Sequence, residues 1–149
     1  RRLAHAYRRM SRADLDARAR AVVSEAVARQ ILNGPQFEQL MELDEGTEPG
    51  QPTFLSQVMT TYISDGERLL KTITELQLDR QVLVNKLHEL KGSSLTVGLI
   101  KMHTLTRDME SMAQQGCDTD ALREPLAQLT SGFEEARQLL ATLLQIEQQ

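Results

Sequence analysis

The stretch Leu122–Leu144, "LREPLAQLTSGFEEARQLLATLL", repeats its apolar residues at steps of three and four without a break. This spacing places them on one face of an α-helix, because residues three and four apart lie above one another. A narrow apolar stripe needs other helices to cover it. We therefore predict a helix over residues 119–147 that packs within a helical bundle. The stripe consists of Leu122, Leu126, Leu129, Phe133, Ala136, Leu140 and Leu143.

Three preceding segments have the same periodicity, and no segment shows the sustained alternation of a β-strand. One opens at Pro52 or Thr53, and the others cover residues 80–97 and 99–115. We predict an all-α fold, an antiparallel up-down four-helix bundle, in which the methionines of the third stripe are core residues. The stripes are Leu55, Val58, Tyr62, Leu69, Ile73 and Leu76; Leu83, Leu87, Leu90 and Val97; and Met102, Leu105, Met109 and Met112.

One or two additional helices are expected at the N-terminus, packed across one flank of the bundle. An Ala-rich helix is predicted over residues 13–32, with Val27 among its inward apolar residues, and a short one over Pro35–Leu43. We divide the chain into an Arg/Ala-rich helical extension, residues 1–34, and a bundle domain, residues 35–149. The boundaries follow the Pro, Gly and Asp residues that interrupt helices. These are Asn33-Gly34-Pro35, Glu45–Pro52, Gly98 and Gly116-Cys117-Asp118, with Asp79 as an expected N-cap.

The composition suits one soluble helical domain of 149 residues. Aromatic residues make up only 3% of the chain, so the core must be largely aliphatic. Cys117 is the only cysteine, which excludes an internal disulfide and favours a reducing compartment. No apolar run approaches the roughly 18 residues of a membrane span, so we expect no membrane partner.

The net charge of −4 is unevenly distributed. Residues 1–20 carry +5 and the remainder carries −9. An acidic body argues against nucleic acid as the main partner. We interpret the Arg-rich start as a solvated helix end, and a contact with an anionic surface or a targeting remnant remain alternatives.

The segment "LHELKGSS", Leu87–Ser94, contains a glycine where alanine would favour the helix by roughly 1 kcal/mol. At roughly 100° per residue, His88 points away from the predicted core, and Lys91 and Gly92 lie beside it. Val84 and Leu95 fall on the same outward face. A nucleophile within a small apolar patch indicates a docking surface for another protein.

Each residue of this face has a chemical interpretation. Neutral imidazole is a competent nucleophile near neutral pH, so His88 is the candidate catalytic group. Gly92 would leave room for an approaching partner, and Lys91 could pair with phosphoryl oxygens. The simpler alternative is a surface or capping histidine, to which we assign His5 and His103.

The string H-x-L-K-G-S-S, from His88 to Ser94, on the second long helix of a four-helix segment resembles the histidine-containing phosphotransfer (HPt) family. "FEQLMEL" (37–43), Gly116-Cys117 and "LLQIEQQ" (143–149) resemble the plant cytokinin-pathway members. The likeness covers residues 36–149. Glu89 replaces the Gln that plant members usually carry, and Glu110 and Gln114 lie where the family sometimes has a residue facing the histidine.

The resemblance implies a phosphorelay intermediate that is not an ATP-dependent kinase. His88 would accept a phosphoryl group from a receiver-domain aspartate of a hybrid sensor histidine kinase and pass it to the receiver of a response regulator. Val84, Ser93 and Leu95 would form the receiver-docking surface. The partner receiver would supply Mg²⁺, and this chain would bind no cofactor or metal. A monomer in cytoplasm and nucleus is expected.

Two other readings of the sequence remain. A metal-dependent enzyme would need several His, Cys or carboxylate residues on one face, and His88 and Glu89 point in different directions. A ferritin-like site would need repeated Glu-x-x-His motifs, which the sequence lacks. A helical adaptor that binds receivers without carrying phosphate is the closer alternative. The sequence argues against such an adaptor only through the presence of His88 and Lys91.

Overall fold

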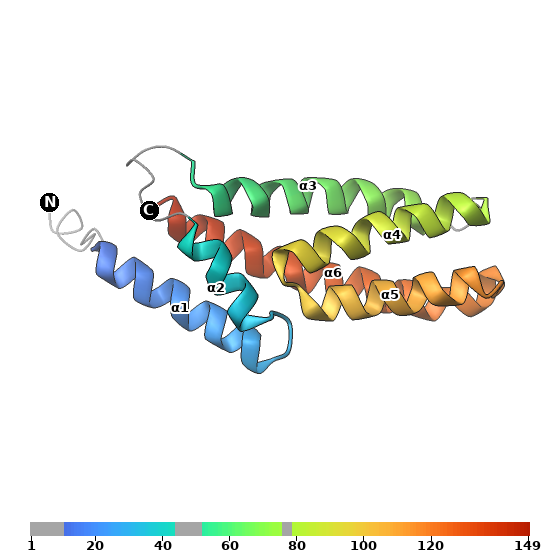
Figure 1. Cartoon of the computed structure of the whole chain (residues 1–149), viewed down its shortest axis with the longest axis horizontal. Helices are drawn as coiled ribbons and strands as arrows, with labels where there is room; N and C mark the ends of the chain where they lie inside the picture. The colour runs from blue at the N-terminus through green and yellow to red at the C-terminus, as the bar shows by residue number, and fades with distance from the viewer. Residues whose placement is uncertain (1–10, 44–51, 76–78) are drawn as a thin grey trace, which may run out of the picture.

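The computed structural model describes residues 11–43, 52–75 and 79–149, and these ranges fold into helices joined by short turns (Figure 1). The all-α prediction is confirmed. In chain order the helices are α1 (Arg12–Ala28), α2 (Gly34–Glu42), α3 (Phe54–Thr74), α4 (Arg80–Val97), α5 (Ile100–Gln114) and α6 (Thr119–Glu147).

The last four helices form the predicted antiparallel four-helix bundle. Contacts join α3 to α4, α4 to α5, α5 to α6, and α6 back to α3, which closes the ring around a shared core. Figure 1 shows α3 and α4 along one side of this bundle and α5 and α6 along the other. Their alternating directions follow from the short connections between them.

Unequal helix lengths explain where the N-terminal helices pack. The 29 residues of α6 span about 44 Å at 1.5 Å per residue, whereas the 15 residues of α5 span about 23 Å. The C-terminal part of α6 therefore extends beyond the bundle's α4–α5 turn (Figure 1). There α1 packs against α6, and α2 contacts α1, α3 and α4.

One continuous hydrophobic core includes residues from all six helices. It contains Val23 and Ala26 of α1 and Phe37 of α2, together with the stripes of the four long helices. Met102 and Met109 are almost fully buried, which confirms their interpretation as core residues. The boundary between residues 34 and 35 stays a prediction, although residues on both sides contribute to this core.

The C-terminal end of α1 differs from the prediction. The helix ends at Ala28 rather than residue 32, because Gln30 takes a positive φ of 61° and turns the chain. Ile31 and Leu32, predicted as helical, instead lie in the following turn and are buried in the core. Val27, predicted to face inward, is 38% exposed.

Both ends of α4 lie where the sequence predicts them. Asp79 Oδ1 accepts a hydrogen bond of 2.9 Å from the backbone N–H of Gln81, and Gly98 ends the helix with φ 80°. The start of α2 supports this end, because the Asn33 N–H donates to Gly98 O at 2.8 Å. The Gln36 amide also donates to the carbonyl oxygens of Leu95 and Thr96.

The sequence predicts one missing step in the apolar stripe of α3 near Asp65-Gly66, and Gly66 occupies that step as a buried residue between Tyr62 and Leu69. Leu76, which we placed at the end of that stripe, lies outside the described residues.

Within the described ranges, none of the helices combines the length and the apolarity that a bilayer span would require.

Candidate functional site

The imidazole of His88 lies on the solvent-facing side of α4, as predicted. Its side chain is 70% exposed, whereas Leu87 and Leu90 on the same helix are completely buried. The core-facing stripe of α4 therefore fixes the direction in which His88 points. Its ring remains accessible to another protein.

Behind this face, Tyr62 of α3 and Ser94 of α4 form a buried hydrogen bond of 2.9 Å between their hydroxyl groups. Ser94 lies on the core side of α4, as the helical geometry predicted. Burial raises the pKa of Tyr62 to about 12, and the hydrogen bond with Ser94 lowers it to a smaller extent. This contact orients α4 against α3.

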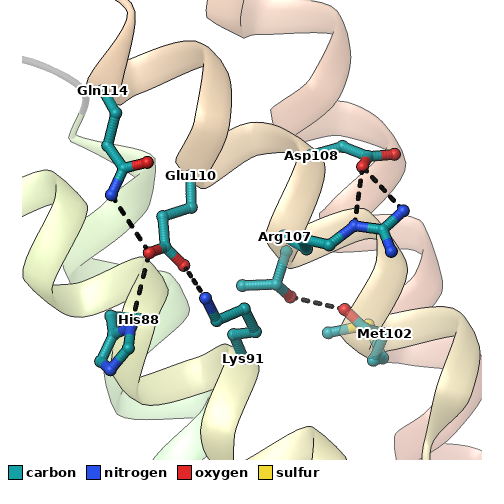
Figure 2. A network of polar contacts seen from close by, with 8 residues as sticks. His88, Lys91, Met102, Arg107, Asp108, Glu110 and Gln114 are labelled. Atoms are coloured by element: carbon teal, nitrogen blue, oxygen red, sulfur yellow. Dashed lines mark hydrogen bonds and ion pairs between the residues drawn. The ribbon is translucent and has the colours of Figure 1, made fainter.

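The side chain of Glu110, on α5, lies between His88 and Lys91 (Figure 2). Its Oε1 is 3.4 Å from His88 Nδ1, and its Oε2 is 2.9 Å from Lys91 Nζ. The Gln114 amide donates to Oε1 at 3.4 Å. Glu110 is only 5% exposed, so α5 holds a nearly buried carboxylate directly behind an exposed imidazole.

This arrangement selects one tautomer of the neutral His88 ring. An ionised carboxylate accepts hydrogen bonds and does not donate them, so the contact with Glu110 favours the tautomer with the proton on Nδ1. The lone pair then belongs to Nε2, which points away from Glu110 in Figure 2. The nitrogen that faces outward is therefore the one that can act as a nucleophile.

The sequence placed Glu110 and Gln114 near the histidine but assigned them no role. The sequence feature that could have pointed to Glu110 is its place directly after Met109, at the edge of the buried stripe of α5. Which oxygen meets which side chain depends on the register between α4 and α5, and a single sequence does not contain that register.

Lys91 and Gly92 occupy the predicted positions beside His88. The Lys91 side chain is 25% exposed and forms its ion pair with Glu110, so its action on a phosphoryl group stays a prediction. Gly92 is exposed, and a Cβ atom added there would meet no other atom within 4 Å. Packing therefore does not require a glycine at this position, which is consistent with a requirement for access.

The predicted docking residues are only partly exposed. Leu95 is 53% exposed, and Ser93 is half-buried, with its hydroxyl donating to Leu90 O at 3.2 Å. Val84 is also half-buried and packs against the core, so it is less exposed than the sequence predicted. Its role in binding stays a prediction.

A groove of about 350 Å³ between α3 and α4 extends this face. It begins near Ser93, five residues or about 7.5 Å along the helix axis from His88. Sequence reasoning missed the groove because it combines side chains of two helices. Its walls are formed by Phe54, Gln57, Val58, Thr61, Tyr62, Asp65, Ser93, Thr96 and Val97.

His103 of α5 is half-buried, and His5 lies outside the described residues. In the part of the chain that the structure describes, no three His, Cys, Asp or Glu side chains are grouped as metal ligands would be.

Comparisons with known proteins agree with this geometry. The model of the Hpt domain matches residues 57–147. Histidine-containing phosphotransfer protein 1 of Oryza sativa subsp. japonica is 30% identical over 144 residues, which cover 94% of this chain and 95% of the rice protein. Histidine-containing phosphotransfer protein 2 of the same plant is 33% identical over 124 residues, covering 80% of this chain and 81% of the relative.

A solved structure of a histidine-containing phosphotransfer protein from maize superposes on this fold with a TM-score of 0.79 and 29% identity. The match covers 90% of this chain and 97% of the maize chain. The N-terminal helices are thus included in the likeness, which extends further than the resemblance seen in the sequence. The chain belongs to the histidine-containing phosphotransfer family and is of the plant type.

Proposed function

We propose that this protein is a phosphorelay intermediate that carries a phosphoryl group on Nε2 of His88. The donor is a phosphorylated aspartate in the receiver domain of a hybrid sensor histidine kinase. The acceptor is the aspartate of a response-regulator receiver. The observation that carries the proposal is the outward Nε2 of an exposed histidine whose other nitrogen faces Glu110.

In the first transfer, the Nε2 lone pair attacks the phosphorus of the aspartyl phosphate. The N–P bond forms as the aspartate O–P bond breaks, and the aspartate leaves as a carboxylate. The chain contributes the nucleophile, its tautomer and an unobstructed approach beside Gly92. The receiver holds Mg²⁺, which neutralises charge on the phosphoryl oxygens. Lys91, about one helical turn after His88 on α4, would add a positive charge near the phosphoryl oxygens.

The docking surface consists of the groove between α3 and α4 together with Leu95. Phe54, at the far end of the groove from His88, is 48% exposed and Leu95 is 53% exposed, so this surface offers apolar side chains to a partner. A surface of this modest size favours transient binding, which a carrier needs in order to exchange one receiver for another. Ser93 and Thr96 supply polar contacts at its edge.

The family resemblance supports three finer proposals. The protein acts in cytokinin signalling, it moves between cytoplasm and nucleus, and it takes phosphate from receivers rather than from ATP. Incubation with ATP alone should therefore leave it unlabelled. Localisation of a fluorescent fusion in plant cells, with and without cytokinin, tests the first two.

The central experiment incubates the protein with a receiver domain carrying a labelled aspartyl phosphate and Mg²⁺. We expect an acid-labile, alkali-stable label on the wild-type chain and none on His88→Gln. His103→Gln is the matched control, because it removes another helical histidine and should retain the label. A wild-type chain that binds the receiver but stays unlabelled is an adaptor, and that result would overturn the proposal.

A further inference from the structure

Glu110 is the only charged residue that is buried among those the structure describes. A carboxylate loses favourable solvation on burial and needs partners to compensate. Lys91 compensates Oε2 at 2.9 Å. The other oxygen, Oε1, is directed at Nδ1 of an exposed histidine at 3.4 Å, with the Gln114 amide at the same distance. An ion pair with Lys91 alone would not require this second contact.

We propose that Glu110 is a positioning residue for the outward transfer: it keeps Nδ1 of phosphorylated His88 protonated, so that the ring leaves phosphorus as neutral imidazole. This inference rests on the proposed function, since it concerns His88 after Nε2 has been phosphorylated. It adds a role for Glu110 that begins after the phosphoryl group has arrived.

The reason lies in the charge of the ring. When the Nε2 lone pair bonds to phosphorus, a ring that retains its Nδ1 proton becomes positively charged. That proton is then much more easily lost than it is from neutral imidazole. A negative charge accepting a hydrogen bond favours the protonated form. Glu110 Oε1 is placed to provide this contact at Nδ1, on the opposite side of the ring from the phosphoryl group.

The protonation state decides what leaves during the outward step. A receiver aspartate oxygen attacks phosphorus, the O–P bond forms, and the electron pair of the N–P bond returns to Nε2. With a proton on Nδ1, the departing ring is neutral imidazole. Without it, the departing ring is the imidazolate anion, a far poorer leaving group. The inward step begins from neutral imidazole, which keeps its single proton as pH rises, so the loss of rate at alkaline pH belongs to the outward step.

Charged residues of α3, α4 and α5 also form ion pairs with one another, among them Arg107 with Asp108 on α5. From α4, Lys91 pairs with Glu110, and Lys86 lies 3.8 Å from Glu89. From α5, Glu110 is accompanied by the neutral Gln114. From α3, Asp65 at the groove is 3.7 Å from Arg68. Among these carboxylates, Glu110 is the one that reaches the imidazole.

The test uses phosphoramidate, a small phosphoryl donor that modifies imidazole without any receiver. The ring nitrogens of phosphorylated His88 are followed by ¹⁵N NMR as pH is raised, and signals absent from His88→Gln identify the residue. Glu110→Gln is the test variant and Glu110→Asp is the carboxylate rescue. Glu89→Gln is the matched control, since it removes a carboxylate next to His88 that is 55% exposed and pairs with Lys86.

We expect the wild type, Glu110→Asp and Glu89→Gln to keep the Nδ1 proton to a higher pH than Glu110→Gln. As pH is raised, the rate of transfer from the phosphorylated protein to a receiver should therefore begin to fall at a lower pH in Glu110→Gln than in wild type. At an alkaline pH where the wild type is still protonated, the difference in rate should be at least about tenfold. Identical proton loss in Glu110→Gln and wild type would overturn the inference.

The outcome is separable from that of the proposed function. If receivers never label the protein, the phosphoramidate product still reports on Nδ1. Should Glu110→Gln fail to fold, the wild-type protein is compared with a phosphorylated Leu87–Ser94 peptide, which lacks Glu110. Equal loss of the proton with rising pH in protein and peptide would then refute the inference.

Discussion

Gly92 is exposed on α4, and an added Cβ would find open space. Gly92→Ala should therefore stabilise the protein by roughly 1 kcal/mol through helix propensity, measured by urea unfolding. Gly92→Gln should keep the fold but slow transfer from a receiver, because its side chain projects beside the His88 ring. Equal transfer rates for Gly92→Gln and wild type would show that access does not explain this glycine.

Tyr62 makes stability sensitive to alkaline pH. Because burial raises its pKa from 10.0 to about 12, the unfolded chain loses the phenolic proton first as pH rises. This contribution to stability is intact below about pH 10 and is lost between about pH 10 and 12, by up to about 3 kcal/mol. Urea unfolding at a series of pH values should therefore show a steeper alkaline decline for wild type than for Tyr62→Phe.

The phenylalanine variant has its own cost, which serves as a control. It removes the hydrogen bond to Ser94, so at about pH 8 it should be less stable than wild type by about 1 kcal/mol. The two stability curves should converge as pH rises and then cross, because wild type loses up to about 3 kcal/mol and starts only about 1 kcal/mol more stable. Parallel curves would mean that Tyr62 ionises as readily in the folded protein as in the unfolded chain.

At the scale of elements, α3 and α6 are in close contact where Gly66 meets Phe133. A Cβ at Gly66 would overlap the Phe133 ring, which is 5% exposed and lies 6.0 Å from the Tyr62 ring centroid. Gly66→Ala should therefore destabilise the bundle by about 1–3 kcal/mol, despite alanine's better helix propensity. Thermal unfolding monitored by circular dichroism measures this.

The smaller side chain of Phe133→Leu offers a control for this clash. The double variant Gly66→Ala/Phe133→Leu should lose less unfolding free energy than the sum of the losses in the two single variants. Strict additivity would show that the helices do not meet through this pair.

The helices were largely predictable, because periodic stripes and caps act locally. Asp79 and Gly98 delimit α4 as expected, and the unbroken stripe of α6 gives the predicted bounds. The end of α1 was not predictable from the stripe, since the αL turn at Gln30 carries neither Gly nor Asn. Likewise, the outward direction of His88 follows from one helix, whereas its contact with Glu110 depends on two.

At the scale of the whole molecule, α1 covers the part of α6 that extends beyond α5. Deleting residues 1–28 removes Leu15, Val23 and Ala26 from the interior and exposes this part of α6. Burial is worth about 1.5–3 kcal/mol for each of the two large side chains, Leu15 and Val23, so the loss should be about 3–6 kcal/mol. Urea unfolding of the truncated and full chains measures the difference.

The same truncation bears on the predicted domain boundary. If residues 35–149 formed an independent domain, removal of α1 would leave the unfolding midpoint almost unchanged. A reduced midpoint would instead support one cooperative unit. The variant Arg29→Ala, which loses only the 3.0 Å ion pair with Glu135, separates the effect of surface charge from that of burial.

The amide of Gln36 donates to the last carbonyls of α4, on the helix that carries His88 and Leu95. The first turn of α2 is therefore connected to the helix that presents His88 and Leu95, at a distance from the imidazole itself. Substitutions there would alter which regulators are recognised while leaving the phosphate-bearing atom itself untouched. Members of a family with the same residues around the histidine could thus acquire different receiver partners by varying this remote contact.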